Sequence, residues 1–320
     1  MILETAVANL LSPPVLAFLL GLIAVAVRSD LRIPEALTKT ISLYLLLAIG
    51  LKGGMALREA SFAEVIGPLV LSLLLGIAIP FVVFVVLGFV SRLGPIDRGS
   101  VAAHYGSTSL VTFTAALVFL ESLAIDYPGY APALLTVLEI PGIVVGIVLA
   151  SRASTTGVRW GAALHEVFAG TSIFLLSGGL LLGLIVGETG YAGVRPFFEE
   201  PFRGVLALFL LGLGIEAGQR FGSLRQAGFG LLVFAAVFPF AVGSAVVAIA
   251  VLAGMGHGGA VVLAILCGSA SYIAAPAAVR LALPDANLAV PLAASIGVTF
   301  PINLALGIPY LTWLAAVLTG

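Results

Sequence analysis

The sequence predicts an all-α integral membrane protein with ten transmembrane helices, arranged as two inverted five-helix repeats whose fourth and ninth helices are broken and cross. Three observations lead to this fold class: the composition, the spacing of apolar runs and an internal repeat. Of the 320 residues, 61% are hydrophobic and only 9% are charged, whereas a soluble domain carries roughly 25% charged residues. Because so few charged side chains cannot cover a water-facing surface, most of the chain must face lipid.

Ten apolar runs are long enough to be membrane helices, since crossing the hydrocarbon core takes about 20 residues in helical form. They lie at about 14–28, 37–57, 66–91, 100–121, 130–151, 165–187, 203–219, 227–254, 258–281 and 287–318. A transmembrane barrel would instead show alternating segments of about ten residues. The connectors are short, so the sequence predicts no soluble domain.

Lys and Arg residues are divided unevenly between the two sets of connectors, which predicts the orientation in the membrane. Four lie in one set, namely Lys52, Arg58, Arg195 and Arg203, and the other ten lie in the opposite set. We expect the richer set to be cytoplasmic, which gives a multi-pass protein of the bacterial inner (plasma) membrane with both termini outside. The net charge of −1 gives no indication of nucleic-acid binding.

The two halves of the chain repeat at a shift of 162 residues. The matched pairs are Gly50 and Gly212, Arg58 and Arg220, Gly106 and Gly268, Ser107 and Ser269, and Ser109 and Ser271. Coincidence is the alternative, because Gly and Ser are common in membrane helices. Five helices is an odd number, so the second copy would enter the membrane upside down, as in many transporters. We therefore divide the chain into a first repeat, 1–155, and a second repeat, 156–320.

Two matched segments, 104–112 and 267–276, interrupt the fourth and ninth runs with Gly, Ser and Pro, which weaken or break a helix. A broken helix offers unpaired amides that favour an anion, and carbonyls and hydroxyls that favour a cation such as Na⁺. Tight helix packing is the alternative use of small residues. The predicted substrate-binding residues are Gly106, Ser107, Thr108, Ser109, Ser269, Ala270, Ser271 and Tyr272.

Three polar residues of other runs are candidates for binding an ion. Glu139 lies inside the fifth run, where a carboxylate is costly and usually faces a cavity or a partner. Thr299 and Asn303 lie four residues apart, hence on one helix face of the tenth run. The alternative for Glu139 is a protonated or hydrogen-bonded contact between helices, and the alternative for Thr299 and Asn303 is polar packing within the helix bundle.

Nothing in the sequence indicates catalysis. We find no nucleophile elbow, phosphate loop or paired carboxylates at catalytic spacing, and the histidines His104, His165 and His257 are scattered. We therefore expect no enzyme activity, no catalytic residue, no cofactor and no metal site beyond a possible Na⁺ site. His104 could instead couple transport to protons, since histidine titrates near neutrality, but a packing role is the simpler interpretation.

At these segments the sequence resembles the sodium-dependent bicarbonate transporter family, best known from cyanobacteria. The likeness is carried by stretches 11–18, 33–36, 49–56, 139–141, 201–204 and 261–287. It implies ten spans in two inverted repeats, a gate domain and a core domain, and a homotrimer. It also implies a substrate near the crossing of helices four and nine, with Gly106, Ser109, Thr112, Ser269, Ser271 and Pro276 on matching positions; Thr112 is thereby an ion-binding candidate.

Two departures from the family pattern bear on function. Tyr272 stands where cyanobacterial members carry an acidic residue implicated in sodium binding, so the coupling ion, Na⁺ or H⁺, stays open. The linker between the halves is short, so regulation by a PII-like protein is not expected. The leading prediction is Na⁺-dependent bicarbonate uptake by secondary active transport. The alternatives are transport of another small organic anion, with proton coupling, and a channel-like protein or sensor.

Overall fold

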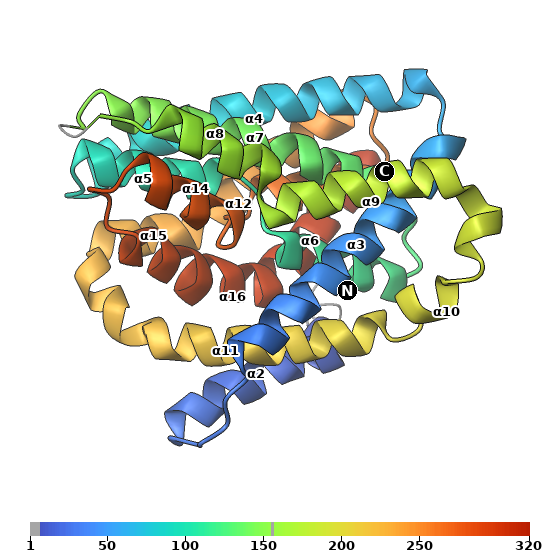
Figure 1. Ribbon diagram of the computed structural model, residues 1–320, viewed down its shortest axis with the longest axis horizontal. Helices are drawn as coiled ribbons and strands as arrows, with labels where there is room; N and C mark the ends of the chain where they lie inside the picture. The colour runs from blue at the N-terminus through green and yellow to red at the C-terminus, as the bar shows by residue number, and fades with distance from the viewer. Residues whose placement is uncertain (1–6, 155–156) are drawn as a thin grey trace.

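The computed structural model describes residues 7–154 and 157–320, and the described part is helical throughout, without a strand (Figure 1). The predicted boundary between the repeats, at 155–156, lies outside the described residues, as do residues 1–6. The first half contains α2 (Pro13–Ala26), α3 (Glu35–Glu59), α4 (Phe62–Val90), α5 (Pro95–Gly106), α6 (Leu110–Ser122) and α7 (Ala131–Ser151). The second half contains α8 (Trp160–Ala169), α9 (Thr171–Tyr191), α10 (Arg195–Phe198), α11 (Phe202–Ala227), α12 (Phe229–Leu252), α13 (His257–Cys267), α14 (Ala274–Ala282), α15 (Ala289–Ala294), α16 (Phe300–Ile302) and α17 (Ile308–Thr319), with π-helical turns η1 (Ser295–Thr299) and η2 (Asn303–Gly307).

Eight helical stretches of the described chain are long and apolar enough to cross a membrane. α2, with 14 residues, and α13, with 11, are apolar but shorter, so the predicted count of ten spans stays a prediction. Large apolar side chains are widely exposed on the outer helices: Phe89 of α4 is 86% exposed, and Leu252 of α12 is 87% exposed. Exposed apolar surface on this scale requires a lipid environment, so we describe the chain as a multi-pass membrane protein.

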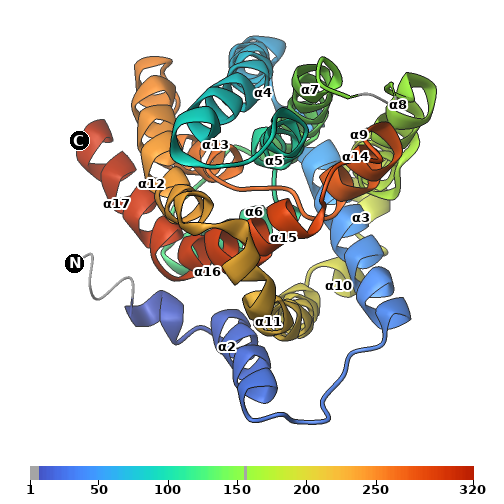
Figure 2. The ribbon, with the colours of Figure 1, turned by 90° about the vertical axis from the view of Figure 1, so that its left-hand side faces the viewer.

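Glycines bring two pairs of helices into backbone contact, which is a common way for membrane helices to pack. α2 lies on α11, where a Cβ atom added to Gly21 would come within 2.3 Å of a backbone oxygen of α11. α3 lies on α9, where a Cβ atom at Gly54 would come within 2.1 Å of the Leu180 oxygen. Figure 2 shows α2 beside α11 at the edge of the molecule, apart from the helices around α5.

The two broken stretches, α5–α6 and α13–α14, lie inside the molecule (Figure 2). The most apolar window of residues 95–122 is 94% buried. α12 packs on one side of α5 through aromatic rings, with Tyr105 4.9 Å from Phe238 and 5.2 Å from Phe234, centroid to centroid. α7 packs on another side, so the broken helices are shielded from lipid by continuous ones.

The sixth predicted run, 165–187, is divided differently in the structure. α8 ends at Ala169 and α9 begins at Thr171, because Gly170 between them is extended, with φ −62° and ψ 151°. The predicted run had joined the end of α8 to α9, since both are apolar and a single glycine is a weak stop signal. The span therefore runs from Thr171 to Tyr191.

Candidate functional site at the crossing of two broken helices

The first predicted break is confirmed between α5 and α6. α5 ends at Gly106, Ser107 and Ser109 are extended, and α6 begins at Leu110. Ser109 terminates the break as the N-cap of α6, because its Oγ accepts hydrogen bonds from the Thr112 backbone N–H (3.1 Å) and the Thr112 hydroxyl (2.9 Å). The N-terminus of α6, with its partial positive charge, therefore lies in the interior of the molecule.

The second predicted break is confirmed between α13 and α14. α13 ends at Cys267, and α14 begins at Ala274. The Ser271 hydroxyl accepts a hydrogen bond from the Ala275 N–H (3.2 Å) in the first turn of α14. Pro276 follows in that same turn, where its missing N–H is not needed for the helix. The N-terminus of α14 therefore lies beside the N-terminus of α6.

Hydrogen bonds hold the two breaks against each other. The Ser271 N–H donates to the His104 carbonyl (2.7 Å), and the Ser109 N–H donates to the Ser269 hydroxyl (3.0 Å). The Ser269 hydroxyl itself donates to the Leu266 carbonyl (2.9 Å) at the end of α13. Backbone groups that the breaks deprive of helical partners are thereby satisfied across the crossing, as buried backbone groups generally require.

A small cavity lies at this crossing, which we call the crossing cavity. Its volume is about 10 Å³ for the centre of a water molecule, so it holds about one water-sized species. Its lining residues come from both breaks, α7 and α9: Thr108, Ser109, Leu110, Ser271, Tyr272, Ile273, Glu139 and Ser172. The N-termini of α6 and α14 both reach this cavity, which is suited to a negatively charged group.

Glu139 of α7 is the one carboxylate that lines the cavity among the described residues. It is 6% exposed, and in the described part of the chain no hydrogen bond or ion pair with another residue accompanies it. The Thr108 hydroxyl is also buried and has no hydrogen-bond partner within the described residues, and the buried Tyr272 hydroxyl lies next to the Ser109 side chain. The cavity therefore combines an unpaired carboxyl group, the free Thr108 hydroxyl, the Tyr272 hydroxyl and two helix N-termini, which together can bind both a cation and an anion.

The predicted site residues separate into two groups. Thr108, Ser109, Ser271, Tyr272 and Glu139 line the crossing cavity, whereas the remaining seven do not. Those seven are buried in and around the breaks: Gly106, Ser107, Thr112, Ser269, Ala270, Thr299 and Asn303.

Thr299 and Asn303 bind groups next to the crossing but do not line the crossing cavity. The Thr299 hydroxyl donates to the Ala235 carbonyl (2.8 Å) and accepts from the Tyr105 hydroxyl (2.7 Å). The Asn303 amide donates to the Gly268 carbonyl (2.9 Å) at the second break. Both side chains therefore serve packing and orientation in this conformation rather than the cavity itself.

Sequence reasoning missed Leu110, Ile273 and Ser172 among the lining residues. The first two lie within the predicted segments 104–112 and 267–276, but they are apolar and were not predicted as site residues. Ser172 lies on α9, 33 residues after Glu139, and no local pattern distinguishes it from other serines in membrane helices.

The geometry can be compared with known families at this point. A family model described as the Na⁺-dependent bicarbonate transporter superfamily matches residues 13–316, which is nearly the whole chain. The chain belongs to the Na⁺-dependent bicarbonate transporter superfamily. No curated protein matches the sequence. Because this superfamily is a family of transporters and not of enzymes, the protein is a membrane transporter.

Within this superfamily member, the match includes both breaks, Glu139 and all helices from α2 to most of α17. The crossing cavity therefore lies within the matched region of a transporter family. The coincidence of a polar, buried cavity with two interrupted helices makes it the candidate site for solute binding.

Proposed function

We propose that this protein is a secondary active transporter that imports bicarbonate with Na⁺. The single observation that carries the proposal is that two helix N-termini and one unpaired carboxyl group meet in the same buried cavity. The superfamily name supports both the anion and the cation. We further propose that the crossing cavity is where bicarbonate binds, with the Thr108 and Tyr272 hydroxyls donating hydrogen bonds to it.

Electrostatics supports coupling between the two solutes. An ionised Glu139 would repel an anion at the crossing strongly, because two like charges in a low-dielectric interior cannot both be compensated by hydroxyls. A cation on Glu139 removes this repulsion, so anion binding and cation binding favour each other. Such mutual stabilisation is a thermodynamic coupling between sites, which is what symport requires.

The size of the cavity supports a cycle with an opening step. Bicarbonate has four heavy atoms, whereas the crossing cavity fits about one water-sized species. This conformation therefore corresponds, in our proposal, to a closed state, and loading requires that helices separate. Relative motion of two helix groups around a central site is the usual form of alternating access.

The arrangement of glycine contacts supports the proposed inverted repeats. α2 and α9 would be the first helices of their repeats, and α3 and α11 the second. The first helix of each half packs on the second helix of the other half, as a pseudo-twofold axis would require. We keep ten spans, a gate and a core domain, a homotrimer, external termini and the absence of a cofactor as parts of the proposal.

The test is uptake of labelled bicarbonate into proteoliposomes, with and without an inward Na⁺ gradient. We expect saturable uptake that rises several-fold with the gradient and that empty liposomes do not show. Uptake equal to that of empty liposomes under both conditions would remove bicarbonate as the cargo. Uptake that never saturates would instead favour a channel-like protein.

A second candidate is proton-coupled transport of another small organic anion. The observation that favours it is Tyr272, which lines the cavity. A carboxylate at this position would bind Na⁺ more strongly, whereas a tyrosine adds no negative charge. Replacing the Na⁺ gradient by a pH gradient in the same assay, with formate and acetate as further cargoes, separates the two candidates. Accumulation driven by the pH gradient alone would favour the proton.

A further inference from the structure

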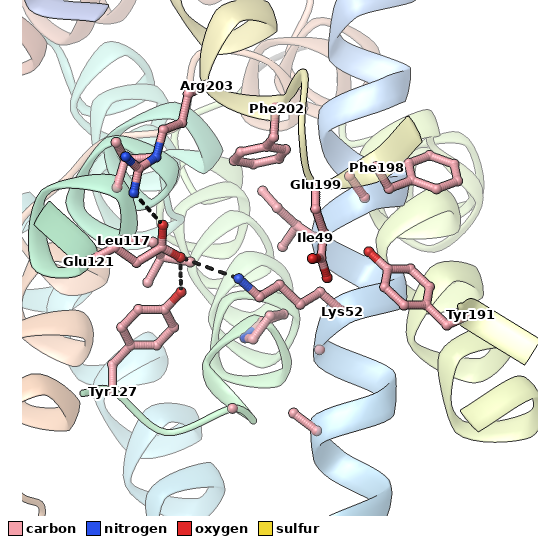
Figure 3. A pocket seen from close by; sticks show the side chains of 16 residues that line it. Ile49, Lys52, Leu117, Glu121, Tyr127, Tyr191, Phe198, Glu199, Phe202 and Arg203 are labelled. Carbon is pink, nitrogen blue, oxygen red and sulfur yellow. Dashed lines mark hydrogen bonds and ion pairs between the residues drawn. The ribbon is translucent and has the colours of Figure 1, made fainter. Parts of the chain in front are cut away.

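A second and larger cavity lies away from the crossing, which we call the vestibule (Figure 3). Its volume is about 260 Å³, measured as for the crossing cavity. It lies where the C-terminal ends of α3, α6 and α9 meet the N-terminal ends of α7 and α11. By the distribution of Lys and Arg, this is the face that we expect to be external.

Three charged side chains from three helices meet in the vestibule. The carboxylate of Glu121, on α6, pairs with Lys52 of α3 (3.3 Å) and with Arg203 of α11 (3.1 Å). The Tyr127 hydroxyl donates a third hydrogen bond to this carboxylate (2.8 Å). Figure 3 shows the Lys52 and Arg203 side chains pointing toward Glu121 from different sides.

Positive charge exceeds negative charge only locally, around Glu121, because the lining of the vestibule contains two cations and two carboxylates. Glu121 faces two cations, whereas the other lining carboxylate, Glu199, lies 3.7 Å from Arg195, which lies outside the lining and also pairs with Glu188. The side chains of Lys52, Glu121 and Arg203 are 33–58% exposed. Ion pairs this exposed contribute little to stability, so Glu121 can be exchanged for another anion without disrupting the fold.

Two helices connect the vestibule to the crossing cavity. Ser109, the N-cap of α6, lines the crossing cavity, and Leu117 of α6 lines the vestibule, eight residues or about 12 Å further along the helix. α7 lines the crossing with Glu139 and the vestibule with Pro132, seven residues or roughly 10 Å away. Both separations equal about two helical turns, so the two cavities lie one above the other along the same pair of helices.

We propose that Lys52 and Arg203 form a second anion-binding site, occupied by the Glu121 carboxylate when the vestibule is empty and by a small monovalent oxyanion when one enters. An entering carboxylate or bicarbonate has the same charge and planar oxygen geometry as Glu121, so it can pair with both cations in its place. Its role as a loading site for the crossing cavity rests on the proposed function, whereas the binding itself does not.

The chain offers an unusually direct binding assay, because it contains only two lysines, Lys52 and Lys39. Lys39 is also paired with a glutamate, Glu35 (2.8 Å), but lies toward the other end of α3. The rate of modification by an amine-reactive ester is followed at both lysines by mass spectrometry of the purified protein. Formate is the probe, and gluconate at the same ionic strength is the control for a bulky anion.

We expect formate to slow the modification of Lys52 at least threefold, while Lys39 reacts at an unchanged rate. Protection should weaken in Arg203→Gln, which lacks one of the two cations, and strengthen in Glu121→Gln, which lacks the competing carboxylate. If formate slowed the modification of both lysines equally, or protected Lys52 less in Glu121→Gln, the proposed exchange of Glu121 for an entering anion would be wrong.

Uptake kinetics test the loading role separately. We expect Arg203→Gln and Lys52→Gln to raise the KM for bicarbonate roughly fivefold, since each removes one cation close to the anion, with little change in the maximal rate. Lys39→Gln is the matched control and should leave KM unchanged. Equal KM in all three variants would overturn the loading role. Protection of Lys52 without any bicarbonate uptake would instead retain the anion site and reject the proposed cargo.

Discussion

Gly142 of α7 is the position where one added methyl group should most damage the crossing. A Cβ atom built there lies 1.9 Å from the Gly106 carbonyl oxygen and 2.5 Å from the Ser107 nitrogen, both at the first break. Real Cβ contacts are essentially never shorter than 3.0 Å. In Gly142→Ala, α7 and the first break must therefore separate by about 1.1 Å, the difference between 3.0 and 1.9 Å.

The cost can be worked out from what that separation disturbs. Overpacking alone typically destabilises a protein by about 1–3 kcal/mol. The displaced segment also carries the two crossing hydrogen bonds, from Ser271 to His104 and from Ser109 to Ser269. At about 0.5–1.5 kcal/mol each, their loss amounts to about 1–3 kcal/mol, or on the order of 5- to 150-fold in affinity.

The measurement compares bicarbonate uptake and thermal stability of Gly142→Ala with those of Gly178→Ala. Gly178 is the matched control, because it also lies within a membrane helix, but nothing lies within 4 Å of its Cβ position. We expect the Gly142 variant to lose at least tenfold in uptake efficiency and the Gly178 variant to match the wild type. A Gly142→Ala protein with wild-type KM and maximal rate would refute the crossing as the transport site.

Three further predictions follow from the same geometry. Ser109→Ala should lower the midpoint of thermal unfolding more than a substitution without a capping role, because it removes the N-cap of α6 at about 1 kcal/mol; an unchanged midpoint would contradict that role. Glu139→Gln should retain exchange of bicarbonate across the membrane but lose accumulation driven by the cation gradient, which counterflow and gradient-driven uptake measure side by side. Tyr127→Phe should lower KM by loosening Glu121, equally from about pH 6 to 9, because burial and the neighbouring Glu121 raise the pKa of Tyr127 above its usual value near 10; a pH-dependent effect in that range would contradict this.

The two breaks could be predicted from the sequence because their signals are local. Gly106 with the serines of 107–109, and Gly268 with Pro276, weaken a helix wherever they occur in an apolar run. The same residue types then cap the following helices, as the Ser109 and Ser271 hydroxyls do. Local propensity and global fold agree at these positions, which is why a reading of the chain alone finds them.

The contacts that complete each cavity could not be predicted, because they join residues far apart in the sequence. Glu121 meets Lys52 across 69 residues and Arg203 across 82. Helical spacing placed Thr299 and Asn303 on one face, but it could not say that this face supports Tyr105 and Gly268 rather than lining the cavity. Helical periodicity in the sequence gives the direction of a side chain relative to its own helix. Which residue of another helix it contacts depends on how the helices pack.

Exchange at Glu121 would also link substrate entry to helix movement. Lys52 and Arg203 attach α3 and α11 to Glu121 at the end of α6. An anion that takes both cations leaves α6 free of these two ion pairs, while α6 carries Ser109 at its other end, in the crossing cavity. The helices that must separate to admit bicarbonate are then released by the arrival of the anion itself. If so, cross-linking α3 to α6 beside this cluster should trap bicarbonate outside the crossing cavity while leaving formate protection of Lys52 intact, and loss of that protection would place the anion site elsewhere.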